Sequence, residues 1–481
     1  MDRTELSDEI IDELGRRFVT VLKRNAAQLV EGDLDTIERH VQGMARSILG
    51  PVVQAAVLSI AETSSAVHPR CPKCKEPMRP IDYHRSRNLV GLVGDYELAR
   101  AYFFCDACRV GLVPLDEELG IGQGCLSPSL ERVACFFGID DSFRDAAVAL
   151  HEALQIELHP EVTRRVTEGI GQVAEAEQQA AMALAEAGKD PLPAEKVMAG
   201  SSTLLVEVDG ALVHEADGHW HEVKSGLAVP LGPEVETDEK TGRTSLAMGK
   251  ASYCAGFETA QVFWYRAYVE ACRQGLGTAL VTMVVLLGDG ADWIWHYGKT
   301  FLTVGGVKLV EIVDIYHAFE HLGVVANAVF GQGSQLAREW LEPLKKDLEA
   351  QGAGPVLAGL AALKPEGADA ADEVRKAIDY FTEHAPRMDY PRFRALGLPI
   401  GSGAIESTCK TLIERREKGA GMRWSESGAQ AIASLRAIYR SGRWDAFWRT
   451  HPQRRRPRVY ERIPRTQTEP AEPPLATKRA A

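Results

Sequence analysis

The chain lacks an uninterrupted apolar stretch long enough to cross a membrane. Its longest mostly apolar run, residues 280–287, is far shorter than the roughly 20 residues that a membrane helix needs. The first residues, MDRTELSDEI, are acidic and contain no apolar core, which argues against a secretory signal. Cysteine is scarce, and an odd count of 9 among 481 residues argues against a secreted disulfide framework. We therefore expect a cytoplasmic protein with no membrane partner.

The chain also has too little positive charge to be an obvious nucleic-acid-binding protein. Its 55 basic and 67 acidic residues leave a net charge of -12, although local patches rather than the total decide binding. Residues 431–465 carry ten arginines and two acids. A solvated, charged tail is one interpretation of this segment, and contact with DNA phosphates is the other. The candidate phosphate-binding residues are Arg436, Arg440, Arg454, Arg455 and Arg456.

Two C-x-x-C pairs stand 30 residues apart, with a segment rich in β-forming residues between them. They are Cys71 with Cys74, and Cys105 with Cys108, and Gly94-Asp95 is a turn candidate in the intervening segment. Two such pairs can complete a tetrahedral Zn²⁺ site, and no open coordination position is evident. The pattern predicts a structural zinc ribbon, and the alternative is two redox or incidental pairs.

Three helical segments follow, at residues 128–137, 142–154 and 160–174. The short turn before Pro160 is typical of a helix-turn-helix. Arg164 and Arg165 would then lie near the start of a recognition helix, where contacts with base edges occur. The alternative is a plain helical hairpin with solvated arginines.

Residues 202–314 alternate between strand and helix patterns. We expect strands at 204–208, 219–230, 244–257, 279–287 and 308–313, with helices at 259–274 and 292–301. Three strands followed by helix, strand, helix and strand describe an RNase H-like α/β sheet. Residues 315–390 are almost entirely helical, and Gly401-Ser402-Gly403 then opens another helix.

Three carboxylates stand out by their positions on these elements. Asp209 ends the first strand, Asp289 ends the fourth, and Glu406 lies in the first turn of the late helix. Because strand ends gather at one sheet edge, the three can converge on Mg²⁺ or Mn²⁺, and two such ions about 4 Å apart catalyse phosphodiester displacement. Each residue also has a structural interpretation: Asp209-Gly210 as a hairpin turn, Asp289 as a loop or helix cap, and Glu406 as an ion-pair partner of Lys410.

The predicted architecture is a multidomain α/β protein. Its parts are an N-terminal helical region (1–66), a zinc ribbon (67–118), a helix-turn-helix-like DNA-binding region (126–182), an RNase H-like catalytic domain (200–314 and 399–450), an all-helical insertion (315–398), and a basic, then disordered, tail (451–481). We expect the two N-terminal helices, divided by a break at residues 31–33 with Asp33 as N-cap, to serve packing or dimerisation, and the alternative is a capping layer on the core.

Several motifs resemble those of ISKra-type bacterial insertion-sequence transposases, which are DDE enzymes related to Mutator-like transposases. They are VEVDG (206–210), LGDGADWIW (287–295), DIYHAFEHL (314–322), GSGAIEST (401–408) and the CPKC…CDAC ribbon, and the resemblance covers about residues 65–450. It implies that Asp209, Asp289 and Glu406 form the metal-binding triad of an RNase H-like domain, and that His317 of the D-x-x-H motif lies near the active site. It also implies Mg²⁺-dependent cleavage of double-stranded DNA at the element's terminal inverted repeats and strand transfer to target DNA. No covalent protein intermediate is involved, and the chain would act as a homodimer or larger assembly on DNA.

Two other functions must be weighed. One is a catalytically inactive or domesticated transposase-derived DNA-binding protein, against which the intact triad argues. The other is a zinc protease, because His317, Glu320 and His321 fit the H-x-x-E-H pattern. A protease would leave the triad and the ribbon unexplained, so we favour a packing role for His321.

Overall fold

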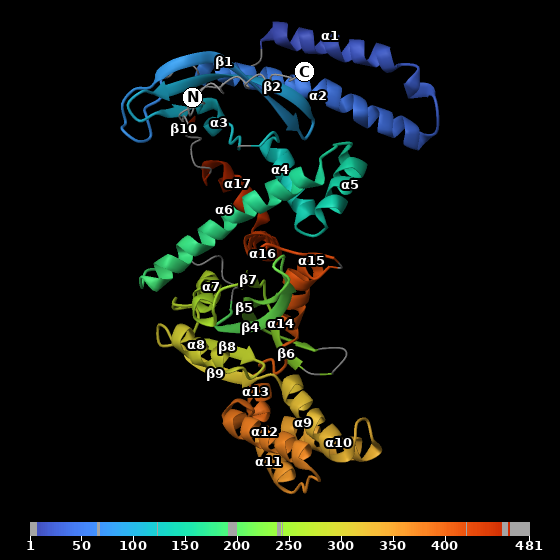
Figure 1. Ribbon diagram of the computed structural model, residues 1–481, viewed down its shortest axis with the longest axis vertical. Coiled ribbons are helices and arrows are strands. Elements are labelled where there is room, and N and C mark those ends of the chain that lie inside the picture. Colours follow the sequence, from blue (N-terminus) through green and yellow to red (C-terminus); the bar gives the residue numbers. More distant parts are fainter. Residues whose placement is uncertain are drawn as a thin grey trace, which may run out of the picture. The chain divides into compact units, whose positions relative to one another are not determined.

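The computed structural model describes residues 7–64, 68–122, 124–190, 200–237, 242, 244–419, 421–454 and 460–461. The chain forms two compact units. The first comprises Met1–Val133, Leu150–Glu157 and Trp448–Ala481, and the second comprises Ala134–Ala149 and Leu158–Phe447. Both contain helices and sheet strands (Figure 1), so the protein is of mixed α/β class, as predicted.

The first unit begins with two helices, as the sequence predicts. Helix α1 (Asp8–Asn25) is followed by the short helix η1 (Gln28–Val30) and the long helix α2 (Leu34–Ser64). Asp33 caps α2, because its Oδ1 accepts a 3.0 Å hydrogen bond from the backbone N–H of Thr36. Gly32 has a φ of 101°, which suits glycine at this break.

Helix α2 changes the expectation that no segment of the chain is long and apolar enough to cross a membrane. Its portion Leu34–Ile60 is long and apolar enough to cross a membrane by length and composition, with a mean hydropathy of 1.4 over 18 residues and 11% of that window buried. The search for unbroken apolar runs missed it because charged residues interrupt the segment. Length and composition are weak evidence for a membrane span, since core helices and signal sequences pass the same test.

An antiparallel sheet completes the first unit, in the order β1-β2-β3-β10. The loop between β1 and β2 comprises residues 92–93, so the turn predicted at Gly94-Asp95 is displaced by two residues. A side chain on Gly94, whose φ is 146°, would collide with the α2 backbone at Arg46 and Gly50. The elements are β1 (Arg79–Gly91), β2 (Gly94–Cys105), β3 (Val110–Leu112), α3 (Pro114–Glu118) and β10 (Tyr460–Glu461).

The three helices predicted before residue 202 are present as α4 (Pro128–Gly138), α5 (Phe143–Leu154) and α6 (Pro160–Glu186). Helix α6 runs past the predicted end at residue 174 without a break, and it packs against α16 (Glu426–Arg440). A side chain on Gly171 of α6 would collide with Ala431 of α16, which indicates a close approach of the two helices.

The second unit is built on a mixed sheet in the order β6-β5-β4-β8-β9, with β7 also paired to β5. Strands β4, β5, β6 and β7 pair antiparallel, and β8 and β9 join β4 in parallel. The strands and intervening helices are β4 (Thr203–His214), β5 (Trp220–Thr237), β6 (Thr244–Met248), β7 (Ser252–Gly256), α7 (Ala260–Arg273), β8 (Met283–Gly288), α8 (Asp292–Leu302) and β9 (Lys308–Val313).

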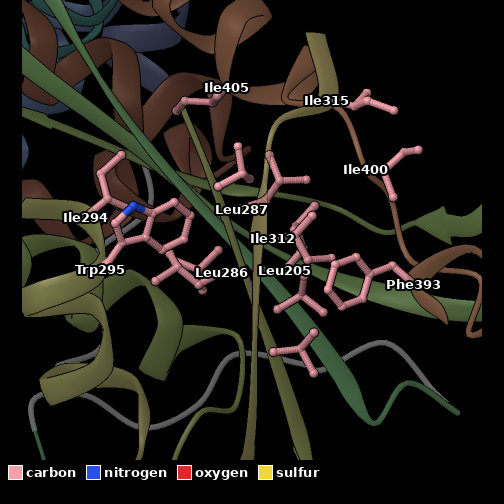
Figure 2. Packing of buried hydrophobic residues seen from close by; sticks show 14 of the residues in the cluster. Leu205, Leu286, Leu287, Ile294, Trp295, Ile312, Ile315, Phe393, Ile400 and Ile405 are labelled. Carbon is pink, nitrogen blue, oxygen red and sulfur yellow. The ribbon is translucent and has the colours of Figure 1, made fainter. Parts of the chain in front are cut away.

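The core of this unit lies around the central strands. Figure 2 shows Leu205 of β4, Leu286 of β8 and Ile312 of β9, with Trp295 of α8 beside Leu286. All of these side chains are buried or nearly so. The near-continuous apolar sequence of β8 follows from this burial on both faces of the sheet.

The predicted all-helical segment is also present, and Figure 1 shows its helices gathered next to β9. The C-terminal helices then return to the sheet, where α14 contacts β4 and β5. These elements are α9 (Ile315–Phe330), α10 (Gln335–Gln351), α11 (Ala353–Ala361), α12 (Ala368–His384), η2 (Ala385–Arg387), α13 (Tyr390–Ala395), α14 (Gly403–Thr408), the π-helix η3 (Cys409–Glu414), α15 (Arg415–Glu417) and α17 (Trp444–Arg454).

Candidate active site and metal centre

Asp209 lies on β4 just beyond the point where parallel pairing with β8 ends. The last parallel pair joins Glu207 to Leu287, and β4 then continues as one arm of a hairpin with β5. A turn at Asp209-Gly210 is therefore wrong, as is a strand end at residue 208, because Asp209 pairs with Ser225 inside the ladder. The carboxylate nevertheless emerges at the carboxyl edge of the parallel strands, where ligands bind in such sheets.

The Asp209 carboxylate has two protein partners. Its Oδ1 accepts a 2.7 Å hydrogen bond from the N–H of Gly210, and its Oδ2 accepts one from the Cys409 thiol at 3.4 Å. Burial raises the pKa of Asp209, the Asp289 carboxylate raises it further, and His317 opposes the rise. Asp289 and His317, both far away in the sequence, are thus electrostatic neighbours of Asp209.

Asp289 occupies the loop between β8 and α8. Its Oδ1 accepts a 2.8 Å hydrogen bond from the N–H of Ala291, so the interpretation of Asp289 as a loop residue also applies, whereas the N-cap of α8 is Ala291. Tyr380 of α12 donates a 3.3 Å hydrogen bond to the backbone oxygen of Asp289. A Cβ on Gly290, whose φ is 113°, would lie 2.9 Å from the Tyr380 ring. The helical insertion therefore supports the loop that carries Asp289.

Asp314, at the end of β9, joins two segments of the site. Its Oδ1 accepts a 3.0 Å hydrogen bond from the N–H of Tyr316 and so caps α9. Its Oδ2 accepts a 2.6 Å hydrogen bond from the Ser402 hydroxyl, just before α14. Next to this bond, the N–H of Ile315 donates to the oxygen of Ile400 at 3.0 Å. The start of α9 and the segment leading to Glu406 are thus held together.

His317 lies in the first turn of α9, with its side chain 41% exposed and its Nδ1 3.5 Å from Glu320 Oε2. His321, one turn later, is half-buried and stacks on Tyr380, with the ring centroids 3.8 Å apart. This stacking agrees with a packing role for His321. Within the described part of the chain, these residues do not form a group of three ligand atoms within 4.8 Å, so the geometry gives the zinc-protease alternative no support.

Glu406 lies in the first turn of α14 and is exposed, as predicted from its position. Lys410 Nζ lies 3.9 Å from Glu406 Oε2, so the i, i+4 ion pair considered from the sequence is present. Such an exposed pair contributes little to stability and leaves the carboxylate accessible to a ligand.

Glu207 is a fourth carboxylate at this edge, and the sequence analysis did not select it. It is fully buried on β4, and its Oε2 accepts a 2.7 Å hydrogen bond from the N–H of Ile405. Its pKa is raised to about 8, mainly by burial and further by the nearby carboxylates Asp314, Asp209 and Glu406, although the hydrogen bond from Ile405 opposes the rise. The sequence feature that could have identified Glu207 is its position as an acidic residue inside the apolar run 204–208.

The three predicted carboxylates therefore lie on elements that meet at one sheet edge. The charge of Asp289 raises the pKa of Asp209, and the charges of Asp209 and Glu406 raise the pKa of Glu207. Their oxygen atoms do not, however, all lie within 4.8 Å of one another among the described residues. The edge is strongly acidic, and carboxylate oxygens are the ligands that hard divalent cations prefer.

The four ribbon cysteines form a compact cluster in the first unit that can bind a metal ion such as zinc. The sulfur atoms of Cys71, Cys74, Cys105 and Cys108 all lie within 4.8 Å of one another, and those of Cys74 and Cys105 are 3.6 Å apart. Four thiols at this spacing match a closed, tetrahedral structural site.

The backbone around both cysteine pairs has the same shape. Lys75 and Arg109, each following the second cysteine of a pair, have φ values of 66° and 57°. The backbone N–H of Cys74 lowers the pKa of Cys71 to about 6. The backbone N–H of Cys108 acts in the same direction on Cys105, but burial and the neighbouring thiols raise the pKa of Cys105 and of Cys108 overall. A bound metal ion would favour the thiolate form of these sulfurs.

Arg436 is not available to DNA, which corrects the prediction from the sequence. It is buried, its Nε donates a 2.8 Å hydrogen bond to the oxygen of Leu412, and it also bonds Ile139, Asp140 and Thr411. It therefore joins three segments of the second unit. Arg440, one turn later, is half-buried.

The two arginines of α6 differ in their surroundings. Arg164 pairs at 2.6 Å with both Glu161 and Glu168, so a DNA phosphate would have to compete with two carboxylates. Arg165 is exposed, and its Nε lies 3.8 Å from Glu161 Oε1. Arg165 is thus the better candidate for a DNA contact.

The remaining basic candidates lie near the C-terminus. Arg454 is the last residue of α17, and Arg455 and Arg456 lie outside the described residues. Their predicted role stays a prediction.

A scan of protein-family models finds none that matches the chain, and a search of curated proteins finds no matching relative.

Proposed function

We propose that the chain is a DDE-type transposase that binds the ends of an insertion sequence and catalyses DNA strand cleavage and strand transfer. One observation carries the proposal: three carboxylates from distant parts of the sequence lie on segments that meet at one sheet edge. Asp209 and Asp289 each follow the last parallel pair of β4 and β8, and Glu406 follows Ile405, whose N–H binds Glu207 of β4. The strand order β6-β5-β4-β8-β9 further supports an RNase H-like catalytic domain, with α9 to α13 as its helical insertion.

The donors at this edge suit Mg²⁺ or Mn²⁺, because they are carboxylate oxygens in an acidic environment. Asp209, Asp289 and Glu406 would hold the ions. Bound ions of this kind activate a water or hydroxyl nucleophile and stabilise the leaving oxygen in phosphodiester displacement.

The surrounding residues would keep the carboxylates in position. The Ser402–Asp314 hydrogen bond fixes the approach to α14, and Tyr380 supports the loop of Asp289. His317, exposed beside Asp209, can donate a hydrogen bond to the scissile phosphate. Such fixed positions matter because a displacement of about 1 Å can cost roughly 100-fold in rate.

DNA binding would rest on other parts of the chain. Arg165 of α6 and the arginines of the C-terminal stretch are the candidate phosphate contacts, and the cysteine cluster would hold a structural Zn²⁺. We propose that the chain acts in the cytoplasm as a homodimer or larger assembly on double-stranded DNA.

The test uses DNA that spans the reading frame's flanks, where terminal inverted repeats would mark an element. The purified chain is incubated with this DNA and Mg²⁺, Mn²⁺ or Ca²⁺. We expect cleavage at the repeat ends with Mg²⁺ or Mn²⁺. Binding without cleavage would instead support an inactive, transposase-derived DNA-binding protein, and the absence of both would contradict the proposal.

A further inference from the structure

A second group of potential metal ligands lies at the end of the β4–β5 hairpin. Glu215, Asp217 and His221 offer ligand atoms that all lie within 4.8 Å of one another. His221 Nε2 is 2.9 Å from Asp217 Oδ2 and 3.9 Å from Glu215 Oε2. Glu215 follows Asp209 by six strand positions, or about 20 Å at the rise of an extended strand, so this group is separate from the acidic sheet edge.

Burial distinguishes this group from an ordinary surface acid cluster. Glu215 is only 6% exposed, and its Oε1 is shielded from solvent with no hydrogen-bond partner among the described residues. Its Oε2 faces His221 at 3.9 Å, beyond hydrogen-bond distance. A buried carboxylate with an unsatisfied oxygen is costly unless a cation or a donor compensates it.

The hairpin end holds Glu215 in this position through its backbone. The N–H of Glu215 donates to the oxygen of His219 at 3.0 Å, and the N–H of Ala216 donates to the oxygen of Trp424 at 2.7 Å. The second bond ties the hairpin end to the segment before α16. The backbone that carries Glu215 is therefore held in place on both sides of the hairpin end.

The charges around the group favour a cation. Burial raises the pKa of Glu215, the carboxylates of Glu426 and Asp217 add to the rise, and His221 opposes it. Glu417, fully buried nearby, also has two side-chain oxygens with no hydrogen-bond partner in the described chain. Arg436 and Arg416 oppose the charge of Glu417, so the charge that a cation would offset at the hairpin end is that of Glu215 and Asp217.

We propose that Glu215, Asp217 and His221 bind one Zn²⁺ ion at the end of the β4–β5 hairpin. An imidazole nitrogen and two carboxylate oxygens are ordinary zinc ligands, and three protein ligands leave a fourth position for water. The mixed nitrogen and oxygen set favours zinc over Mg²⁺ or Ca²⁺, which prefer oxygen alone. The ion neutralises the buried Glu215 and fixes the hairpin end. This site does not depend on the proposed transposase activity.

The test counts Zn²⁺ on the full-length chain, using zinc as the only probe. Because the cysteine cluster also binds zinc, the measurement is made on the Cys105→Ser variant, dialysed against micromolar Zn²⁺ with excess Mg²⁺ to occupy the acidic edge. We expect about one Zn²⁺ per chain. Adding His221→Ala or Asp217→Asn should weaken zinc binding at least about tenfold.

His219→Ala is the matched control, because His219 is an exposed imidazole on the same hairpin end and is not part of the ligand group. It should bind zinc as the Cys105→Ser parent does. Asp217 is exposed, so Asp217→Asn should fold normally even if changes at the buried Glu215 do not. Unchanged zinc affinity in both His221→Ala and Asp217→Asn would overturn the proposal, as would binding that requires millimolar zinc in the parent.

Discussion

The carboxylate of Glu207 accepts a 2.7 Å hydrogen bond from the backbone N–H of Ile405, a residue 198 positions later in the chain. Glu207 lies two residues before Asp209 on β4, and Ile405 directly precedes Glu406 on α14. This bond therefore connects the first and last members of the proposed triad. A second connection, from Ser402 to Asp314, fixes the same segment to the start of α9.

Glu207 should make stability depend on pH. Its pKa is raised from 4.5 to about 8, so the folded state keeps a proton that the unfolded state has lost between these values. Stability from this group is fully present below about pH 4.5 and is lost as the pH rises through about 8. Glu207→Gln keeps an acceptor for Ile405 and should flatten the fall of the melting temperature between pH 5 and 9. An unchanged slope would mean that Glu207 is ionised in the folded protein.

Ser402→Ala should reduce catalysis through position rather than chemistry. It removes the 2.6 Å hydrogen bond to Asp314 and so loosens the segment that leads to Glu406. We expect strand cleavage to fall by about tenfold to 100-fold at saturating DNA. Ser407→Ala, which alters an exposed serine of α14, is the control and should cleave normally. Equal rates for both variants would show that the bond does not position the site.

Cys105→Ser should remove zinc from the ribbon and weaken the folding of the first unit. The four sulfurs form a closed cluster, so loss of one ligand leaves too few for a stable structural site. Metal analysis and proteolysis of the variant are compared with Cys125→Ser, which changes an exposed cysteine outside the cluster. Proteolysis that matches the control, or zinc retained by the cluster thiols, would refute a structural role.

Arg436 and the C-terminal arginines should behave differently. Arg436→Met removes a buried guanidinium group that donates hydrogen bonds to several backbone oxygens. It should lower the free energy of unfolding by on the order of 3 kcal/mol. Neutralising Arg454, Arg455 and Arg456 together should leave the melting temperature unchanged and reduce the salt dependence of DNA affinity by up to about three phosphate contacts. An unchanged salt dependence would make the C-terminal stretch a solvated tail only.

Much of the fold follows from local sequence pattern. Most strands and helices between residues 202 and 314 were predicted with small shifts, because buried strands are apolar runs bounded by polar turns. The segment 244–257, predicted as one strand, instead forms the two strands β6 and β7, each paired with β5. The extension of β4 to His214 was not predicted, since Asp209-Gly210 is a common turn pair and only pairing with β5 shows that the ladder continues. The point at which a strand ends depends on the strand it pairs with, and a local sequence pattern does not identify that partner.

The site was predicted less completely than the fold. Asp209, Asp289 and Glu406 were selected because the sequence pattern places each at a strand end or in the first turn of a helix, although β4 continues past Asp209. Arg436 was assigned to DNA from helical spacing alone, which reveals a shared face but not the residues that cover it, such as Ile139, 297 positions earlier. Glu207 was overlooked because an acid within an apolar strand becomes informative only when its partner, Ile405, is known.

The most direct test of the account compares single amide substitutions at the acidic edge. Asp209→Asn, Asp289→Asn and Glu406→Gln keep side-chain size but remove the charge that metal ions require. The control is Asp292→Asn, an exposed acid in the first turn of α8, three residues after Asp289. His317→Ala should give an intermediate rate, because this residue would contact the phosphate without holding metal.

The measurement is cleavage of end-containing DNA with Mg²⁺, at matched DNA occupancy. The account predicts that each of the three triad variants binds DNA but cleaves almost none, while Asp292→Asn cleaves nearly as well as the unaltered chain. Cleavage by all three triad variants would contradict the transposase mechanism, and an inactive Asp292→Asn beside an active Asp289→Asn would contradict the assignment of the second carboxylate.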